Sequence, residues 1–218
     1  MKDFIKDKIR EGLIESILDE DYPTTWNVED FKKLNSFNTR VRYCEANLQR
    51  ISSGSARIVY KIDDEKVLKL AKNKKGIAQN GAETQWMNDY YFDEILAKII
   101  DADPNDLWVE MELARKVTPQ MFKSYFGFDI NIIFKYLTHR FNINNGRKSY
   151  FGDVSPEIAD VLSENRDIQT IYEFADACGS VGDLGKLSSY GLVKRGGHDS
   201  IVIIDFGLNN DVWKSYYS

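Results

Sequence analysis

Cysteine, proline and long apolar runs are scarce in this sequence, whose 218 residues include two cysteines and four prolines. Cys44 and Cys178 lie far apart, and neither belongs to a CxxC or Cys/His spacing, so we expect no zinc site of that kind and no disulfide framework. No apolar run approaches the roughly 18 residues of a membrane span. Charges interrupt residues 1–6, where a signal peptide would be apolar. These absences predict a cytoplasmic protein with no membrane partner.

Several catalytic motifs are also missing. The sequence contains no G-x-S-x-G, H-E-x-x-H or G-x-G-x-x-G pattern, the usual signatures of α/β-hydrolases, zinc metalloproteases and dinucleotide-binding folds. His139 and His198 stand alone, without a matching cysteine, aspartate or serine constellation. The chemistry must therefore be sought elsewhere in the chain.

Positive charge is in deficit. The 34 acidic residues outnumber the 29 basic ones and give a net charge of −5, which argues against a general electrostatic grip on nucleic acid. The one dense basic cluster, Lys72, Lys74 and Lys75, is interpreted as a solvated turn. With 43% hydrophobic and 29% charged residues, the composition is that of a globular protein. We therefore expect a folded domain without a nucleic-acid partner.

The first half of the chain mixes helix and strand patterns. Apolar residues at three- and four-residue steps predict an amphipathic helix over residues 4–18, which packs on the domain or, as the alternative, contacts a partner or a membrane surface. Residues 21–47 are typical of turns with a short helix near 28–34. Two β-branched runs, at 51–62 and 67–70, predict a hairpin.

A longer helix and a strand are expected next. Residues 76–100 have a helical pattern whose buried side would contain Trp86, Tyr90, Ile95, Leu96 and Ile99. A strand is expected at 107–113.

The second half is mainly helical. Its predicted elements are helices near 130–141 and 168–177, a helix start at Pro156, strands at 190–193 and 200–204, and a final segment at 212–217 that packs on the domain. A strand-rich first half and a helix-rich second half predict an α+β fold with two lobes.

Small residues gather in the turn of the first hairpin, at Ser52, Ser53, Gly54 and Ser55. The backbone N–H groups of such a turn can close over phosphate groups. A serine- and glycine-rich turn without a ligand is the commoner meaning of the pattern, so the turn needs support from other residues.

Lys69 stands among apolar neighbours in the run at 67–70. A lysine in that setting is costly to bury unless a carboxylate pairs with it. Glu83 on the following helix is the first choice of partner, and Glu94 is the second. The alternative is an edge-strand lysine that faces water.

Taken in order, these features resemble the protein-kinase fold. Gly54 corresponds to the central glycine of the kinase G-x-G-x-x-G-x-V loop, with Ser52 and Arg57 at the positions of the outer glycines. Lys69 corresponds to the lysine of the V-A-I-K strand, and Glu83 to its helix partner. The resemblance covers residues 48–208 and is closest to uncharacterised kinase-like proteins of tailed bacteriophages.

The resemblance also assigns the strand at 107–113 to the segment that leads into the interlobe hinge. Met111 would lie at the back of a nucleotide pocket. Backbone groups of Glu112, Leu113 and Ala114 would then meet the adenine edge of ATP.

The kinase metal-binding and catalytic motifs have counterparts in the second half. Asp205 begins an Asp-Phe-Gly tripeptide after an apolar run and would bind Mg²⁺. Asp183 corresponds to the general base, and Lys186 would approach the transferring phosphate. Ser188 stands where kinases have an asparagine and would be a weaker metal ligand.

The sequence departs from the kinase pattern in two places. Val181 and Gly182 replace the histidine and arginine that brace the catalytic loop. The printed sequence stops at Ser218, shortly after Gly207, without room for an activation segment. We therefore expect a helical extension at 1–47, a strand-rich lobe at 48–115 and a reduced helical lobe at 116–218.

These observations predict a kinase-like nucleotide-binding protein. Three alternatives stay open: a phosphotransferase that uses ATP and Mg²⁺, an inactive pseudokinase that binds a host or viral protein, and a structural component of a virus particle.

Overall fold

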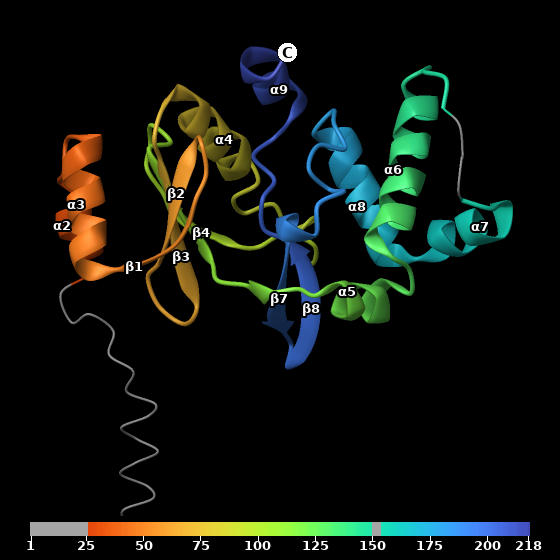
Figure 1. Ribbon diagram of the computed structural model, residues 1–218, viewed down its shortest axis with the longest axis horizontal. Coiled ribbons are helices and arrows are strands. Elements are labelled where there is room, and N and C mark those ends of the chain that lie inside the picture. The colour runs from red at the N-terminus through yellow and green to blue at the C-terminus, as the bar shows by residue number, and fades with distance from the viewer. Residues whose placement is uncertain (1–25, 150–153) are drawn as a thin grey trace, which may run out of the picture.

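A computed structural model describes residues 26–149 and 154–218, so the helix predicted at 4–18 lies outside the described residues. Figure 1 shows a sheet flanked by two short helices on one side, a helical region on the other and a β-hairpin between them. The predicted α+β class and the mainly helical second half are confirmed. The division at residues 47 and 115 stays a prediction.

The first sheet is antiparallel and has the strand order β1-β2-β3-β5-β4. Its strands are β1 (Gln49–Ser53), β2 (Arg57–Lys61), β3 (Lys66–Ala71), β4 (Ile99–Ala102) and β5 (Trp108–Glu112). The run expected at 51–62 is divided in two, because Gly54 donates its N–H to the carbonyl of Arg57 at 2.9 Å and closes a turn there.

Side chains alternate between the two faces of this sheet, as the pleat requires. Leu68 and Leu70 of β3 belong to a core shared with the preceding helices, whereas Val67 and Lys69 line a cleft on the opposite face. The alternation in β3 therefore decides which residues can reach a ligand.

Two short helices, α2 (Val28–Lys32) and α3 (Phe37–Asn47), cover the face of the sheet that points away from the cleft. The short helix near 28–34 is confirmed, but the interpretation of the rest of 21–47 as turns is wrong for α3. Ser36 and Thr39 form a capping box that starts α3. Phe31 of α2 is fully buried and makes an edge contact with Trp108 of β5.

The helix α4 (Lys74–Thr84) contacts β3, β4 and β5. The prediction of a helix as far as residue 100 is wrong beyond Thr84. Asn88 adopts a left-handed φ of 68°, which is incompatible with a continuous helix. Tyr90, expected on the buried side, is 86% exposed. Trp86 instead packs against Phe92 and Phe174 of the helical region.

The second half contains five helices and a small sheet within the described residues. The elements are β6 (Arg115–Lys116), α5 (Pro119–Phe126), α6 (Ile130–Asn144), α7 (Pro156–Glu164), α8 (Arg166–Ala177), the 3-10 turn η1 (Leu187–Ser189), β7 (Tyr190–Arg195), β8 (His198–Ile203) and α9 (Asn210–Tyr216). The helices and the hairpin expected here are confirmed. Among the described helices, none has the length and apolar character needed to cross a bilayer.

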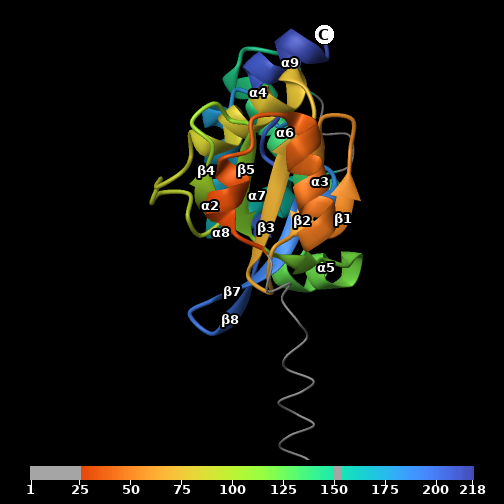
Figure 2. The same cartoon turned by 90° about the vertical axis from the view of Figure 1, so that its left-hand side faces the viewer.

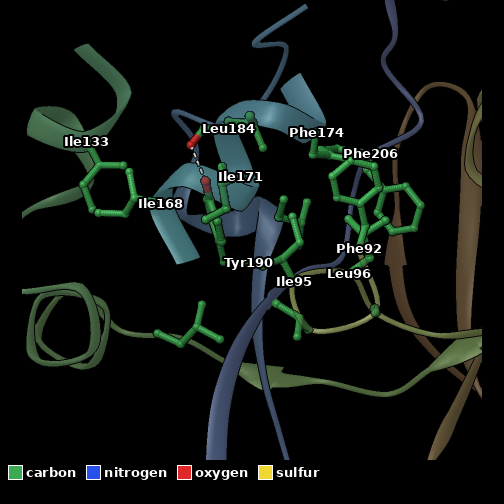
Figure 3. Packing of buried hydrophobic residues seen from close by; sticks show 14 of the residues in the cluster. Phe92, Ile95, Leu96, Ile133, Ile168, Ile171, Phe174, Leu184, Tyr190 and Phe206 are labelled. Atoms are coloured by element: carbon green, nitrogen blue, oxygen red, sulfur yellow. Dashed lines mark hydrogen bonds between the residues drawn. The ribbon is translucent and has the colours of Figure 1, made fainter. Parts of the chain in front are cut away.

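The hairpin β7–β8 joins the two regions (Figures 1 and 2). Ala97 donates its N–H to the carbonyl of Ile203, and Ile203 donates to Ile95, so the end of β8 is fastened to the chain that follows α4. In Figure 3, Phe92, Ile95 and Leu96 pack with side chains of α6, α8 and the hairpin. This shared core holds the end of β8 beside α4.

We expect Phe31→Ala to lower the free energy of unfolding by about 3–5 kcal/mol, because it leaves a cavity between α2 and the sheet. Tyr90→Ala is the control and should change it by less than about 0.5 kcal/mol, since that ring is exposed. Urea unfolding followed by circular dichroism measures both. Equal losses for the two variants would contradict the docking of α2 on the sheet.

Candidate functional site

A cleft of about 950 Å³ opens between the first sheet and the β7–β8 region. The predicted site residues that line it are Ser52, Gly54, Ser55, Lys69, Met111, Glu112, Leu113, Ala114, Asp183, Lys186, Ser188 and Asp205. Two predicted site residues do not line it: Ser53 ends β1, and Glu83 lies fully buried behind Lys69. The residues expected to form a site therefore surround one cavity.

Lys69 and Glu83 form a buried ion pair at the inner end of the cleft. The Lys69 Nζ donates to Oε1 and Oε2 of Glu83 at 2.9 and 3.0 Å, and to the backbone carbonyl of Ile204 at 2.7 Å. The alternative of a solvated edge lysine is wrong, because Lys69 lies on a central strand and is 6% exposed. Glu94, the second choice of partner, is exposed and pairs with Arg166.

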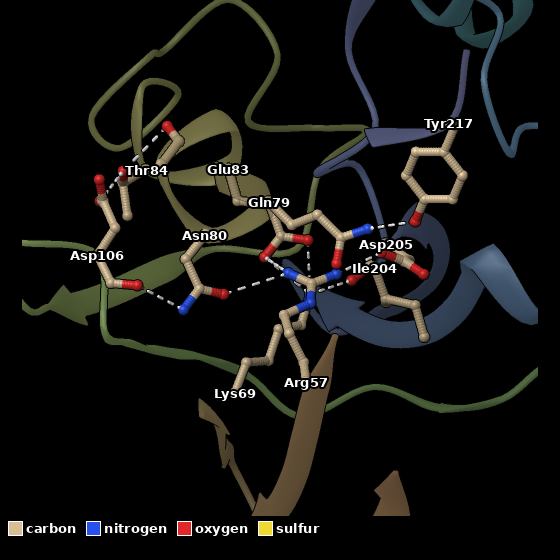
Figure 4. Close-up of polar contacts among 11 residues, drawn as sticks. Arg57, Lys69, Gln79, Asn80, Glu83, Thr84, Asp106, Ile204, Asp205 and Tyr217 are labelled. Carbon is tan, nitrogen blue, oxygen red and sulfur yellow. Dashed lines mark hydrogen bonds and ion pairs between the residues drawn. The ribbon is translucent and has the colours of Figure 1, made fainter. Parts of the chain in front are cut away.

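Arg57 is a site residue that the sequence did not single out. Its Nη1 lies 2.8 Å from Oε2 of Glu83, and its Nη2 donates to Oδ1 of Asp205 at 2.6 Å. Arg57, Lys69, Glu83 and Asp205 therefore form one connected group, which we call the charge cluster (Figure 4). The strand pattern could have indicated this position, because Arg57 and Val59 are two residues apart on β2 and therefore point to the same face, which lines the cleft.

Buried polar groups of α4 support the charge cluster from behind. Asn80, fully buried, accepts from Nη1 of Arg57 at 3.4 Å and donates to the carbonyl of Asp106 at 2.8 Å. Thr84 donates to the Asp106 carboxylate at 3.0 Å. Asp106 itself has a left-handed φ of 57°. The orientation of the Arg57 guanidinium is thus held by a second layer of hydrogen bonds.

The charges of the cluster act on one another's pKa values. Burial alone would raise the pKa of Asp205, but the charges of Arg57 and Lys69 hold it below its ordinary value of 3.8. Burial is also the main cause that lowers the pKa of Lys69, with Glu83 opposing it. For Arg57, burial lowers the pKa, and the charges of Glu83 and Asp205 outweigh it. Asp205 and Arg57 are therefore both charged at neutral pH.

Asp183 and Lys186 lie on the other wall of the cleft and pair with each other, with 2.8 Å between Lys186 Nζ and Asp183 Oδ1. The hydrogen bond that Lys186 donates to Asp183 raises the pKa of Lys186. Ser188 is exposed in η1. Gly182 has a φ of 43°, which favours glycine over the arginine of the kinase loop.

The segment at 111–114, which the kinase resemblance predicts to be a hinge and which is called the hinge below, lines the cleft. Met111 is buried, and the N–H groups of Glu112 and Leu113 donate to the carbonyls of Lys98 and Glu65. The Glu112 carboxylate accepts two hydrogen bonds from the Arg195 guanidinium. This bidentate pair ties the hinge to β7.

The end of α9 reaches the cleft, so the final segment packs on the domain as expected. Tyr217 accepts a hydrogen bond from Gln79 Nε2 of α4 at 3.0 Å. Lys75 Nζ lies 3.6 Å from the centroid of the Tyr217 ring, and Trp213 stacks on the same ring. No sequence pattern predicted that Tyr217 lines the cleft.

The donor set for a metal ion is small. Mg²⁺ requires close to octahedral coordination by oxygen atoms. Among the described residues, no group of three or more histidine, cysteine, aspartate or glutamate side chains could hold a metal ion. Asp205 offers one carboxylate, which Arg57 already contacts, and Ser188 offers a hydroxyl. These residues do not by themselves fit a magnesium site.

Comparisons with solved structures find enzymes with SAICAR, ATP or ADP bound. SAICAR synthase from Saccharomyces cerevisiae, complexed with SAICAR, is 14% identical with a TM-score of 0.38, over 75% of this chain and 74% of that chain. The ternary complex of APH(2'')-IIa with streptomycin and ATP is 13% identical with a TM-score of 0.37, over 80% and 71%. Aminoglycoside phosphotransferase APH(2'')-Ib with ADP is 13% identical with a TM-score of 0.34, over 79% and 71%.

No protein-family model matches this sequence, and a search of curated proteins finds no match. Because the TM-scores of the solved structures lie below 0.5, they carry no argument about function. The function is therefore inferred from the cleft itself.

Gly207 lies against the backbone of α4 at Gln79, and this close approach places Asp205 beside the helix. A Cβ at Gly207 would lie 2.6 Å from the backbone carbonyl oxygen of Gln79, whereas a Cβ at Gly54 would meet nothing within 4 Å. We expect Gly207→Ala to lower the free energy of unfolding by about 1–3 kcal/mol through overpacking. Gly54→Ala should change it by less than about 1 kcal/mol. Urea unfolding of both variants is the measurement, and equal stabilities would refute the close approach.

The pH dependence of stability tests the charge on Asp205. Because the pKa of Asp205 is lowered in the folded state, its ionised form adds stability above its ordinary value of 3.8, and that stability is lost as the pH falls through the lower folded value. The difference in free energy of unfolding between wild type and Asp205→Asn should therefore be constant from pH 7 to 5 and shrink below about pH 4. Urea unfolding at several pH values measures it. A difference that grows toward acid would contradict the assignment.

Proposed function

We propose that this chain is a kinase-like nucleotide-binding protein whose cleft takes ATP. The observation that supports it is the buried pair of Lys69 and Glu83 at the inner end of a cleft of about 950 Å³. Replacing a buried ion pair by apolar residues is often neutral or stabilising. A charged pair kept beside an open cavity is therefore better explained by a ligand than by stability.

The chemistry of the lining suits the two ends of a nucleotide. At one end, apolar side chains surround the hinge and could enclose a base: Val59, Val67, Met111, Leu113, Ala114 and Leu187. At the other end lie Lys69, Arg57 and the turn with Ser52, Gly54 and Ser55. A ligand pocket of this kind is largely apolar with a few placed polar groups. ATP has both an apolar face and an anionic tail, so it matches this division.

The backbone hydrogen bonds that the hinge already makes limit which of its groups could contact a base. The N–H groups of Glu112 and Leu113 already donate to other carbonyls. We therefore assign the contact with the base edge to the backbone of Ala114, which follows the end of β5. This assignment makes recognition depend on the main chain, so side-chain variants at these positions should affect it little.

Phosphotransfer is the first candidate activity of the site. Asp183 would accept the proton of an acceptor hydroxyl, and Lys186, 2.8 Å away, would carry positive charge to the transferred phosphate. Nucleotide binding without transfer is the second candidate. It is favoured by Arg57, which contacts the carboxylate predicted to bind Mg²⁺, and by Ser188 in place of an asparagine. A host or viral protein partner and a place in a virus particle stay predictions.

Thermal unfolding with ATP tests nucleotide binding. At a hundred times the dissociation constant, ATP should stabilise the native state by about 2.7 kcal/mol. For a chain of this size, that corresponds to a rise in Tm of about 5–10 °C. Lys69→Ala should lose the rise, because it removes the buried ammonium at the inner end of the cleft. No rise at millimolar ATP in the wild type would contradict the proposal.

Controls separate binding from transfer. Lys123→Ala removes an exposed lysine that pairs with Asp129, and it should keep the full rise in Tm. Asp183→Asn should also keep the rise but abolish ADP release if the protein transfers phosphate. Absence of ADP release from the wild type would favour the second candidate.

A further inference from the structure

Arg57 contacts both acidic residues of the charge cluster, and the proposed nucleotide site does not explain why an arginine is there. The residue begins β2, and its side chain is 9% exposed. Its guanidinium lies between two carboxylates from distant parts of the chain, Glu83 of α4 and Asp205 after β8, with contacts of 2.8 and 2.6 Å. A fixed positive charge therefore occupies the space against Asp205, where the kinase resemblance places a metal ion.

Arg57 neutralises the charge cluster at the inner end of the cleft. The charge cluster contains two cations, Arg57 and Lys69, and two anions, Glu83 and Asp205, so its formal charge is zero. With glycine in place of Arg57, the cluster would carry one net negative charge, and Asp205 would face the cleft without a cation. A triphosphate would then meet a carboxylate, and a divalent ion would be needed between them.

The guanidinium also keeps donors for a ligand. It has five N–H groups. Glu83 and Asn80 engage Nη1, and Asp205 engages Nη2. Toward the described part of the chain, Nε–H and one N–H of Nη2 make no hydrogen bond or ion pair. Arginine donors of this kind form strong, charge-assisted hydrogen bonds with phosphate oxygens.

We propose that Arg57 takes the place of a divalent cation at Asp205, so that the cleft binds the phosphates of a nucleotide without a metal ion. The inference rests on the proposed nucleotide-binding function. Arg57 and Lys69 together hold the phosphates, and Asp205 holds Arg57 in position. A metal ion at Asp205 would lie beside this guanidinium and be repelled by it, because Asn80 and Glu83 support its contact of 2.6 Å with Oδ1 of Asp205.

Isothermal titration of ATP in EDTA and in millimolar Mg²⁺ is the first test. The wild type should bind with dissociation constants that agree within about threefold in the two buffers. Arg57→Ala should bind about 10- to 100-fold more weakly in EDTA, the range of a hydrogen bond to a charged group, and Mg²⁺ should restore most of the loss. Arg57→Lys should lie between them. Arg50→Ala, which removes an exposed arginine paired with Glu45, is the control and should match the wild type.

A second test uses Mn²⁺ alone, with electron paramagnetic resonance of the free ion, and does not require nucleotide. The wild type should bind no Mn²⁺ at the cleft, whereas Arg57→Ala should bind it weakly, through the Asp205 carboxylate and water, and the further change Asp205→Asn should remove that binding. Circular dichroism confirms that each variant is folded. Mn²⁺ binding by the wild type that is lost in Asp205→Asn would overturn the inference.

The outcomes distinguish the two proposals. ATP binding that requires Mg²⁺ in the wild type would overturn the role of Arg57 and leave the nucleotide site intact. Unchanged affinity of Arg57→Ala in EDTA would do the same. Failure of ATP to bind in either buffer would overturn the nucleotide site itself, and with it the assignment of Arg57 to phosphate. Binding in EDTA that depends on Arg57 supports both.

Discussion

The contact between Arg57 and Asp205 is the interaction on which the arrangement of the cleft depends. It joins β2 of the first sheet to the segment after β8, and through Glu83 it extends to α4 and Lys69. Three of these charged side chains, Arg57, Lys69 and Glu83, are buried, whereas that of Asp205 is 48% exposed. Such a group is stable only while every member keeps its partners. The positions of β2, β3, α4 and the segment after β8 are therefore linked by one set of charges.

The surrounding structure serves this group. Asn80 and Asp106 orient the guanidinium from behind, and Tyr217 holds Gln79, the residue before Asn80 on the same helix. On the far side, the bidentate contact between Glu112 and Arg195 ties the hinge to β7. The apolar core beneath the hairpin brings the end of β8 to α4. The cleft is consequently bounded on each wall by side chains whose own positions are restrained.

Much of the site could be predicted from local patterns. Lys69 in an apolar run requires a partner, and the distance to Glu83 fits one strand followed by a helix. Arg57 was missed because it reads as a departure from a glycine pattern, and no local rule pairs a residue with one 148 positions away. The helix expected at 76–100 was too long, because aromatic residues at helical spacing also suit a loop that packs on a distant core. The left-handed backbone of Asn88 is incompatible with a helix that continues through this segment.

The separation between Arg57 and Asp205 bears on how the protein is made. At about 5–20 residues per second, a ribosome adds the 148 intervening residues in roughly 7–30 seconds. During that time Arg57, Lys69 and Glu83 have emerged and can pair among themselves, but their last partner does not yet exist. The emerging sheet then presents an uncompensated positive charge on its cleft face.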